Sequence, residues 1–146
     1  MVALGIGENA DAPGVLGVVQ DPGRYGGEMI IGFTGHRDKV APIERLLQIA
    51  ADYPGATWVT GGAVGFDQSV ERFAAKNGIK NIIYRPNFKQ FGRGAFHARN
   101  RQIVDGASLI VAMWDGRKGG GTVYTINYAR KKGLEVKNLY DSETAS

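Results

Sequence analysis

Short apolar runs alternate with helix-forming segments through residues 29–140, and this alternation limits the fold more than any other feature. The runs lie at 29–35, 57–60, 79–84, 109–113 and 134–140. A continuous apolar run such as 29–35 suits a strand buried on both faces of a parallel sheet. Between the runs, apolar residues recur at helical spacing, with Pro42 in a first turn and Asn77-Gly78 as a stop. The sequence therefore predicts an α/β fold, a single-domain Rossmann-like open parallel sheet of about five strands flanked by helices.

The two ends of the chain differ from the middle in composition. Residues 1–28 contain repeated glycines together with Pro13 and Pro22, which break long helices and strands. We expect this Gly/Pro-rich segment to be an extended or mobile arm, which either packs on a partner subunit or is a leader without function. Residues 141–146 form a polar C-terminal tail, so residues 29–140 are the expected domain.

The chain has no cysteine, which excludes disulfides and thiolate metal sites. It also lacks an apolar run of about 18 residues and a basic start followed by an apolar stretch. We therefore expect neither a membrane span nor a secretory signal, and we expect the protein to be cytoplasmic.

Basic residues are concentrated in the middle of the chain. Residues 1–28 carry a net charge of −3 and residues 141–146 one of −2, so the total of +4 leaves +9 for residues 29–140. No acidic residue occurs from Lys80 to Val104, a stretch that holds six lysines and arginines. Such charge either covers a solvated face or attracts an anionic partner, a phosphorylated small molecule or a nucleic acid.

Three glycine-bearing turns directly follow predicted strands. They are Thr34-Gly35-His36-Arg37, then Gly61-Gly62-Ala63-Val64-Gly65-Phe66-Asp67, and finally Trp114 to Thr122 with Gly119, Gly120 and Gly121. Glycine lets a ligand approach the backbone closely, and the start of a helix presents free N–H groups to an anion. Because the carboxyl ends of parallel strands meet at one edge of the sheet, we expect the three turns to line one anion-binding crevice.

Polar side chains at the turns and on the helix around 96–104 complete the predicted site. We expect Thr122 and the glycine N–H groups to hold a phosphate and Arg99 to neutralise its charge. Arg37, which can also bind a phosphate or carboxylate, is expected to frame the sugar and base side with Gly35, Gly61 and Gly62. Asp67 either accepts hydrogen bonds from ribose hydroxyls or simply favours the first turn of its helix. His36 is either a general base or an ordinary loop histidine. The other expected ligand contacts are Thr34, Asn100 and Trp114.

These turns contain neither GxGxxG nor GxxxxGK[ST], so a standard dinucleotide fingerprint and a P-loop are both excluded. In combination, however, the Thr-Gly-His-Arg turn, the Gly-Gly-Ala-x-Gly-x-Asp turn, the helical Arg99-Asn100 pair and the final Gly-Gly-Gly-Thr resemble the SLOG superfamily. That superfamily includes the Lonely Guy phosphoribohydrolases, the DNA-processing protein A, and small stand-alone proteins thought to bind nucleotide-derived ligands. The resemblance covers about residues 29–140 and implies a nucleotide-binding Rossmann-like domain.

One position separates this chain from the hydrolase branch of the superfamily. There the last motif reads Pro-Gly-Gly-x-Gly-Thr-x-x-Glu, and its Glu works beside a helical Arg. Arg99 matches that Arg, but Asn100 stands where the branch has Lys, and Thr125 stands where it has the Glu. Since threonine cannot act as a general base as a carboxylate does, the resemblance points to the small stand-alone branch.

We therefore expect the chain to bind a nucleotide or nucleotide-derived phosphorylated ligand, with no required cofactor and no metal ion. The alternative is hydrolysis of the N-glycosidic bond of a nucleoside monophosphate, with Arg99, Asp67 and Asp115 as candidate catalytic residues.

Two further expectations concern larger partners. Single-stranded nucleic acid binding is a second alternative, because Phe88, Phe91 and Phe96 lie in or beside the basic loop 87–95. We nevertheless expect these rings to pack under the loop. On the helix that follows, we expect Phe96, Ile103 and Val104 to face inward and His97 to be exposed. A homodimer is also expected, and Tyr124 and Tyr128 either form its face or merely cover the sheet.

Overall fold

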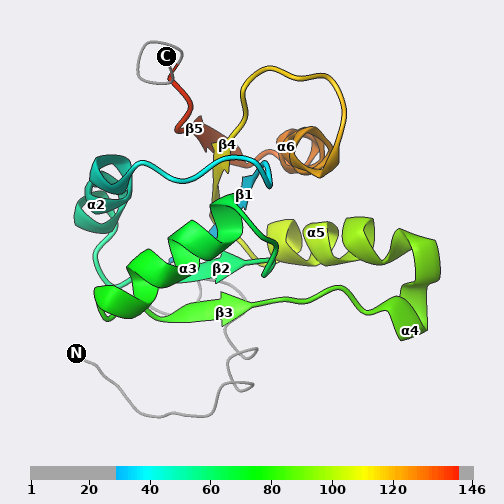
Figure 1. Cartoon of the computed structure of the whole chain (residues 1–146), viewed down its shortest axis with the longest axis horizontal. Coiled ribbons are helices and arrows are strands. Elements are labelled where there is room, and N and C mark those ends of the chain that lie inside the picture. Colours follow the sequence, from blue (N-terminus) through cyan, green and yellow to red (C-terminus); the bar gives the residue numbers. More distant parts are fainter. Residues whose placement is uncertain (1–28, 142–146) are drawn as a thin grey trace.

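The computed structural model describes residues 29–141 (Figure 1). The predicted arm at 1–28 and the tail from residue 142 lie outside the described residues. In chain order the elements are β1 (Ile30–Gly35), α2 (Ile43–Asp52), β2 (Thr57–Thr60), α3 (Phe66–Lys76), β3 (Asn81–Ile83), α4 (Phe88–Phe91), the 3-10 turn η1 (Gly92–Gly94), α5 (Ala95–Asp105), β4 (Leu109–Met113), α6 (Gly121–Lys131) and β5 (Glu135–Asn138).

The five strands form one parallel sheet in the order β3-β2-β1-β4-β5. Side chains of adjacent residues in β1 point to opposite faces, as the twofold repeat of a strand requires. Ile31 and Phe33 pack with α2 and α3, whereas Ile30 packs with Ile103 of α5. Four helices thus cover the two faces, and the predicted Rossmann-like open sheet is confirmed.

The position of a ligand site follows from the neighbouring strands β1 and β4. The chain leaves β1 toward α2 on one face of the sheet and leaves β4 toward α6 on the other. This reversal is the topological switch point of an open α/β sheet, where a crevice forms beyond the carboxyl ends of the strands. The turns after β1 and β4 flank that crevice.

The segment between β3 and β4 differs from the sequence-based expectation. The stretch 87–95, predicted as a loop, contains the helical turns α4 and η1. Phe96 was expected to face inward with Ile103 and Val104, but it is 53% exposed, so this prediction was wrong. Ala95, Arg99 and Ile103 take the inward positions at helical spacing, and Phe96 lies one step further round α5.

The tyrosines of α6 contact α5 and lie half-buried. The Tyr124 hydroxyl accepts a hydrogen bond from Arg101 at 2.9 Å, and the Tyr128 hydroxyl donates one to Asp105 at 2.8 Å. Of the two alternatives for these rings, the structure favours packing within the chain.

Candidate functional site

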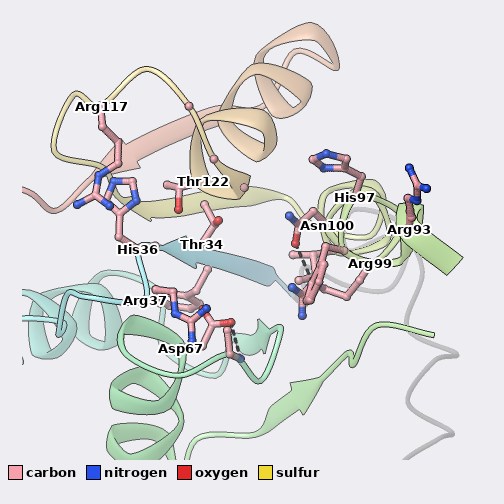
Figure 2. A pocket seen from close by; sticks show the side chains of 18 residues that line it. Thr34, His36, Arg37, Asp67, Arg93, His97, Arg99, Asn100, Arg117 and Thr122 are labelled. Carbon is pink, nitrogen blue, oxygen red and sulfur yellow. Dashed lines mark hydrogen bonds between the residues drawn. The ribbon is translucent and has the colours of Figure 1, made fainter. Parts of the chain in front are cut away.

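A pocket of about 470 Å³ opens at the carboxyl ends of β1 and β4 (Figure 2). Many of the predicted ligand contacts line it, namely Thr34, Gly35, His36, Arg37, Asp67, Arg99, Asn100, Gly119, Gly120, Gly121 and Thr122. The predicted contacts Gly61, Gly62 and Trp114 and the candidate catalytic residue Asp115 are not part of its lining. The first and third glycine turns therefore meet in one pocket, and the second turn contributes Ala63 and Asp67 to it while its glycines lie outside the lining.

Sequence reasoning missed several residues of the lining. These are Phe33, Ala63, Arg93, Phe96, His97, Ile103 and Arg117. Arg93 belongs to the basic stretch that favoured an anionic partner, and Arg117 lies inside the third glycine turn. The positive charge of these two side chains was therefore a signal by which both could have been predicted. His97 was expected to be exposed, which it is, but its exposed ring faces the pocket.

The N-terminus of α6 faces the pocket without an internal cap. Gly120 occupies the N-cap position with a φ of 103°, and no side chain caps the first turn. That turn also contains no acidic residue. A helix start leaves its first N–H groups without backbone partners, so here they remain available for an anion.

Asn100 adds a side-chain donor at the same place. Its Oδ1 accepts a hydrogen bond from Arg99 Nε at 2.7 Å, which fixes the amide orientation because Nε can only donate. Nδ2 therefore points the other way, toward Gly121, and no hydrogen bond within residues 29–141 occupies it. Asn100 is only 9% exposed, and a buried donor without a partner is costly. An acceptor supplied by a ligand would satisfy it.

Arg99 supports one wall of the pocket by hydrogen bonds to backbone carbonyls. Its Nη1 donates to the carbonyl of Gly61 and, at 3.4 Å, to the carbonyl of Tyr84. The guanidinium also lies 5.8 Å from the ring centroid of Phe96. Burial lowers the pKa of Arg99, and the nearby Asp67 carboxylate opposes this shift. The side chain thus remains a cation of the lining, but its described contacts orient Asn100 and hold the turn after β2.

The second glycine turn is closed by carboxylates of α3. Asp67 Oδ2 accepts from the N–H groups of Gly61 at 3.1 Å and Ala63 at 3.2 Å. Glu71 Oε2 accepts from the N–H of Gly62 at 3.1 Å. These donors are therefore already used within the chain, and this turn does not offer them to a phosphate. At the start of α6, by contrast, no side chain within residues 29–141 accepts a hydrogen bond from the first N–H groups.

Asp67 is a buried carboxyl at the base of the pocket, and burial raises its pKa from an ordinary 3.8 to about 6. The native state then binds more protons than the unfolded state between these values, so stability is lost as the pH rises through this window. We expect Asp67→Asn to remove that loss and to raise the free energy of unfolding at neutral pH by up to about 3 kcal/mol. Urea denaturation from about pH 4 to about pH 7 measures the difference.

The matched control is Asp52→Asn, which changes an exposed carboxylate at the end of α2. It should leave the pH dependence of stability as in the natural chain. Burial lowers the pKa of His36, which costs stability as the pH falls, but this effect is common to all three proteins and cancels in the comparison. Parallel pH profiles for the natural chain and Asp67→Asn would refute the assignment.

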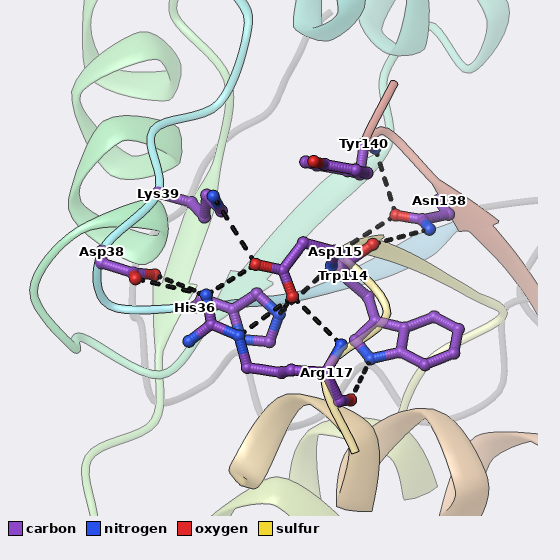
Figure 3. A network of polar contacts seen from close by, with 8 residues as sticks. All are labelled: His36, Asp38, Lys39, Trp114, Asp115, Arg117, Asn138 and Tyr140. Carbon is purple, nitrogen blue, oxygen red and sulfur yellow. Dashed lines mark hydrogen bonds and ion pairs between the residues drawn. The ribbon is translucent and has the colours of Figure 1, made fainter. Parts of the chain in front are cut away.

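A polar network ties the third glycine turn to the loop after β1 (Figure 3). Arg117 Nη2 donates to Asp115 at 2.6 Å and to Asp38 at 3.1 Å, and Lys39 lies 3.6 Å from Asp115. Hydrogen bonding by Arg117 holds the pKa of Asp115 well below its usual range. Asp115 therefore lies outside the lining and is held ionised by cations, an arrangement that anchors the loop and does not suit a general acid or base.

His36 and Trp114 belong to the same anchoring network. His36 is buried, and burial lowers its pKa, so the neutral ring accepts the N–H of Asp115 on Nε2 at 3.3 Å. The equally short approach of Nε2 to the Asp115 carboxylate would be an ion pair only if the ring were protonated. Trp114 Nε1 donates to the carbonyl of Arg117 at 2.8 Å. These contacts favour the loop-histidine interpretation and place Trp114 behind the loop.

The charge of the lining is positive. Arg37, Arg93, Arg99 and Arg117 contribute cations, of which Arg117 is paired with Asp115 and Asp38 outside the lining, and Asp67 is the one carboxyl group of the lining. Among the described residues, no three His, Cys, Asp or Glu side chains gather closely enough to hold a metal ion. An anionic organic ligand is the chemistry that this lining fits best.

No helix within residues 29–141 is long and apolar enough to cross a membrane. Comparisons of the chain with protein families, with curated proteins and with solved structures gave no match.

Proposed function

We propose that the pocket binds a nucleotide or a nucleotide-derived phosphorylated ligand, with a phosphate at the start of α6. The observation that carries the proposal is the buried Asn100 amide, whose Nδ2 is held toward Gly121 without a partner in the described chain. The uncapped N–H groups of α6 and Thr122, which is 4% exposed, lie at the same end of the pocket as this Nδ2. Donors arranged in this way suit the oxygens of a phosphate.

The remainder of the pocket suits the organic part of such a ligand. A volume of about 470 Å³ falls within the usual range for small-molecule sites. Asp67 Oδ1 has no hydrogen bond among the described residues and is available to a ribose hydroxyl, while Phe96 and His97 offer rings to a base. This division agrees with the resemblance to the small stand-alone branch of the SLOG superfamily, which we propose as the family.

The same contacts weigh against N-glycosidic hydrolysis, which we keep as the alternative. Thr125, at the position of the hydrolase Glu, is buried and donates its hydroxyl to the carbonyl of Gly121 at 2.7 Å. Asp115 lies outside the lining, so only Asp67 could replace the missing carboxylate. Asp67 already accepts two backbone hydrogen bonds.

Calorimetric titration with the four common nucleoside 5′-monophosphates, each beside its unphosphorylated nucleoside, tests the proposal. We expect at least one monophosphate to bind more than about tenfold tighter than its nucleoside. Gly119 tests the site directly, because a methyl group there meets no protein atom within 4 Å and yet faces the pocket. Gly119→Ala should therefore leave stability nearly unchanged and weaken the monophosphate more than about tenfold by blocking its approach.

Gly106→Ala is the matched control, since Gly106 also has an ordinary φ and an uncrowded Cβ position but lies outside the pocket. It should bind the monophosphate as the natural chain does. If all the monophosphates fail to bind, the proposal is wrong. Chromatography of the same samples for released base separates binding from hydrolysis.

A second candidate function, single-stranded nucleic acid binding, gains one observation from the structure. Phe88, Phe91 and Phe96 are 54%, 46% and 53% exposed, so the expectation that they pack under the loop was wrong. Exposed rings beside lysine and arginine side chains are typical of surfaces that stack unpaired bases.

The homodimer and the cytoplasmic location stay predictions. If a dimer forms, the exposed apolar residues of α2 suit it better than the occupied tyrosines of α6. Val40, shortly before α2, and Ile43 and Leu47 of α2 are largely exposed beside a second hollow of about 640 Å³ between α2 and α3. That hollow is larger than the pocket, but it lies away from the strand ends and none of the three glycine turns lines it, so we do not assign it a nucleotide.

A further inference from the structure

Three exposed phenylalanines form an aromatic ledge, defined here as Phe88, Phe91 and Phe96. All three lie within nine residues of sequence, on α4 and the start of α5, and about half of each side chain is exposed. The short helix α4 lies beyond the N-terminal end of α5, away from the strands (Figure 1). Exposed apolar side chains that gather on one segment are a candidate interaction surface, unlike apolar side chains scattered singly over a protein.

The ledge is continuous with the pocket. Phe96 lines the pocket, and its ring meets Phe88 edge to face with centroids 5.2 Å apart. The aromatic surface therefore begins inside the pocket and extends outside it. Arg93, which follows α4 in η1, also lines the pocket. Arg93 therefore places a positive charge at the border between the pocket and the ledge.

The charge around the ledge selects the kind of molecule that fits it. No acidic residue occurs between Lys80 and Val104, and Lys89 lies within the ledge segment itself. An apolar protein partner would gain nothing from this charge, whereas a flat aromatic group attached to phosphate would gain from both the rings and the cations.

We propose that the ligand of this pocket carries a second base, joined to the first nucleotide through phosphate, and that this base stacks on the ledge. This inference rests on the proposed nucleotide site. The first nucleotide lies in the pocket with its phosphate at α6, Arg93 contacts the linking phosphate, and the second base lies against Phe88 and Phe91. The ligand class is a dinucleotide.

Titration with a mononucleotide, the corresponding 5′-phosphorylated dinucleotide and a hexanucleotide tests this inference. The dinucleotide should bind about tenfold or more tighter than the mononucleotide, as expected for one additional stacked base. Phe91→Ala and Phe88→Ala should each remove most of this gain and leave mononucleotide affinity within about twofold. Leu47→Ala, which truncates a similarly exposed apolar side chain on α2, should change neither affinity.

The outcomes separate this inference from the proposed function. A mononucleotide that binds as well as the dinucleotide would overturn the inference and leave the proposed function intact, whereas failure of every nucleotide would overturn both. A hexanucleotide no tighter than the dinucleotide supports a two-base ligand. If affinity keeps rising with length and falls steeply with salt, the ledge instead holds a single strand, and the dinucleotide assignment is wrong. Thermal melting of Phe91→Ala and Phe88→Ala confirms that both remain folded.

Discussion

Gly65→Ala is expected to destabilise the protein by at least about 3 kcal/mol, because two separate costs fall on one position. Gly65 has φ 81° and ψ −120°, a backbone conformation that side chains with a Cβ rarely adopt. In addition, a Cβ there would lie 2.0 Å from the carbonyl oxygen of Arg37, which belongs to rigid backbone. Urea denaturation measures the loss, and ligand affinity should fall with it because Arg37 and Asp67 flank this contact.

Gly55→Ala provides the comparison that separates the two costs. Gly55 has nearly the same φ, 80°, but an added Cβ would meet nothing within 4 Å. Gly55→Ala should lower the free energy of unfolding by only about 1–2 kcal/mol, because alanine is less stable than glycine at a positive φ. Equal losses for the two variants would show that the approach of Arg37 to Gly65 contributes nothing.

The central strands were predictable because both of their faces are buried. The apolar runs 57–60 and 109–113 coincide with β2 and β4, whose residues are all buried. The edge strands β3 and β5 are shorter than the predicted 79–84 and 134–140, because each pairs with only one neighbour. Periodicity also wrongly placed Phe96 on the inward face of α5, since an apolar residue one step round a helix still fits the pattern.

The candidate site was predictable where glycine and charge mark strand ends, and less so where distant side chains decide its chemistry. Glu71 reads as an ordinary residue of a helix, and only folding brings its carboxylate to the N–H of Gly62. Adjacent helical residues do not normally face each other, so the bond between Arg99 and Asn100 was not evident from their spacing. That bond fixes which donor faces the pocket.

The strongest test of the anion site is Asn100→Asp, for which stability and binding should change in opposite directions. One oxygen of the new carboxylate would still accept from Arg99 Nε, and the other would replace Nδ2 at the start of α6. A carboxylate at a helix N-terminus beside an arginine stabilises the fold by about 0.3–2 kcal/mol. A phosphate about 4 Å away would meet a repulsion of roughly 4 kcal/mol at an effective dielectric constant of about 20, so nucleotide affinity should fall more than about 100-fold.

Asn127→Asp makes the same change of charge on the exposed side of α6, outside the pocket, and should leave the affinity nearly unchanged. The comparison removes any effect of net charge alone. Unfolding curves and titrations on both variants are sufficient measurements. If Asn100→Asp bound the nucleotide as tightly as the natural chain, no phosphate could lie at Nδ2, and the start of α6 would have to be abandoned as the anion site. If Asn100→Asp instead lost both stability and affinity, the new carboxylate would not be acting as an internal substitute for the ligand. Only a gain in stability together with lost binding identifies the donors of Asn100 and α6 as a site built for an external anion.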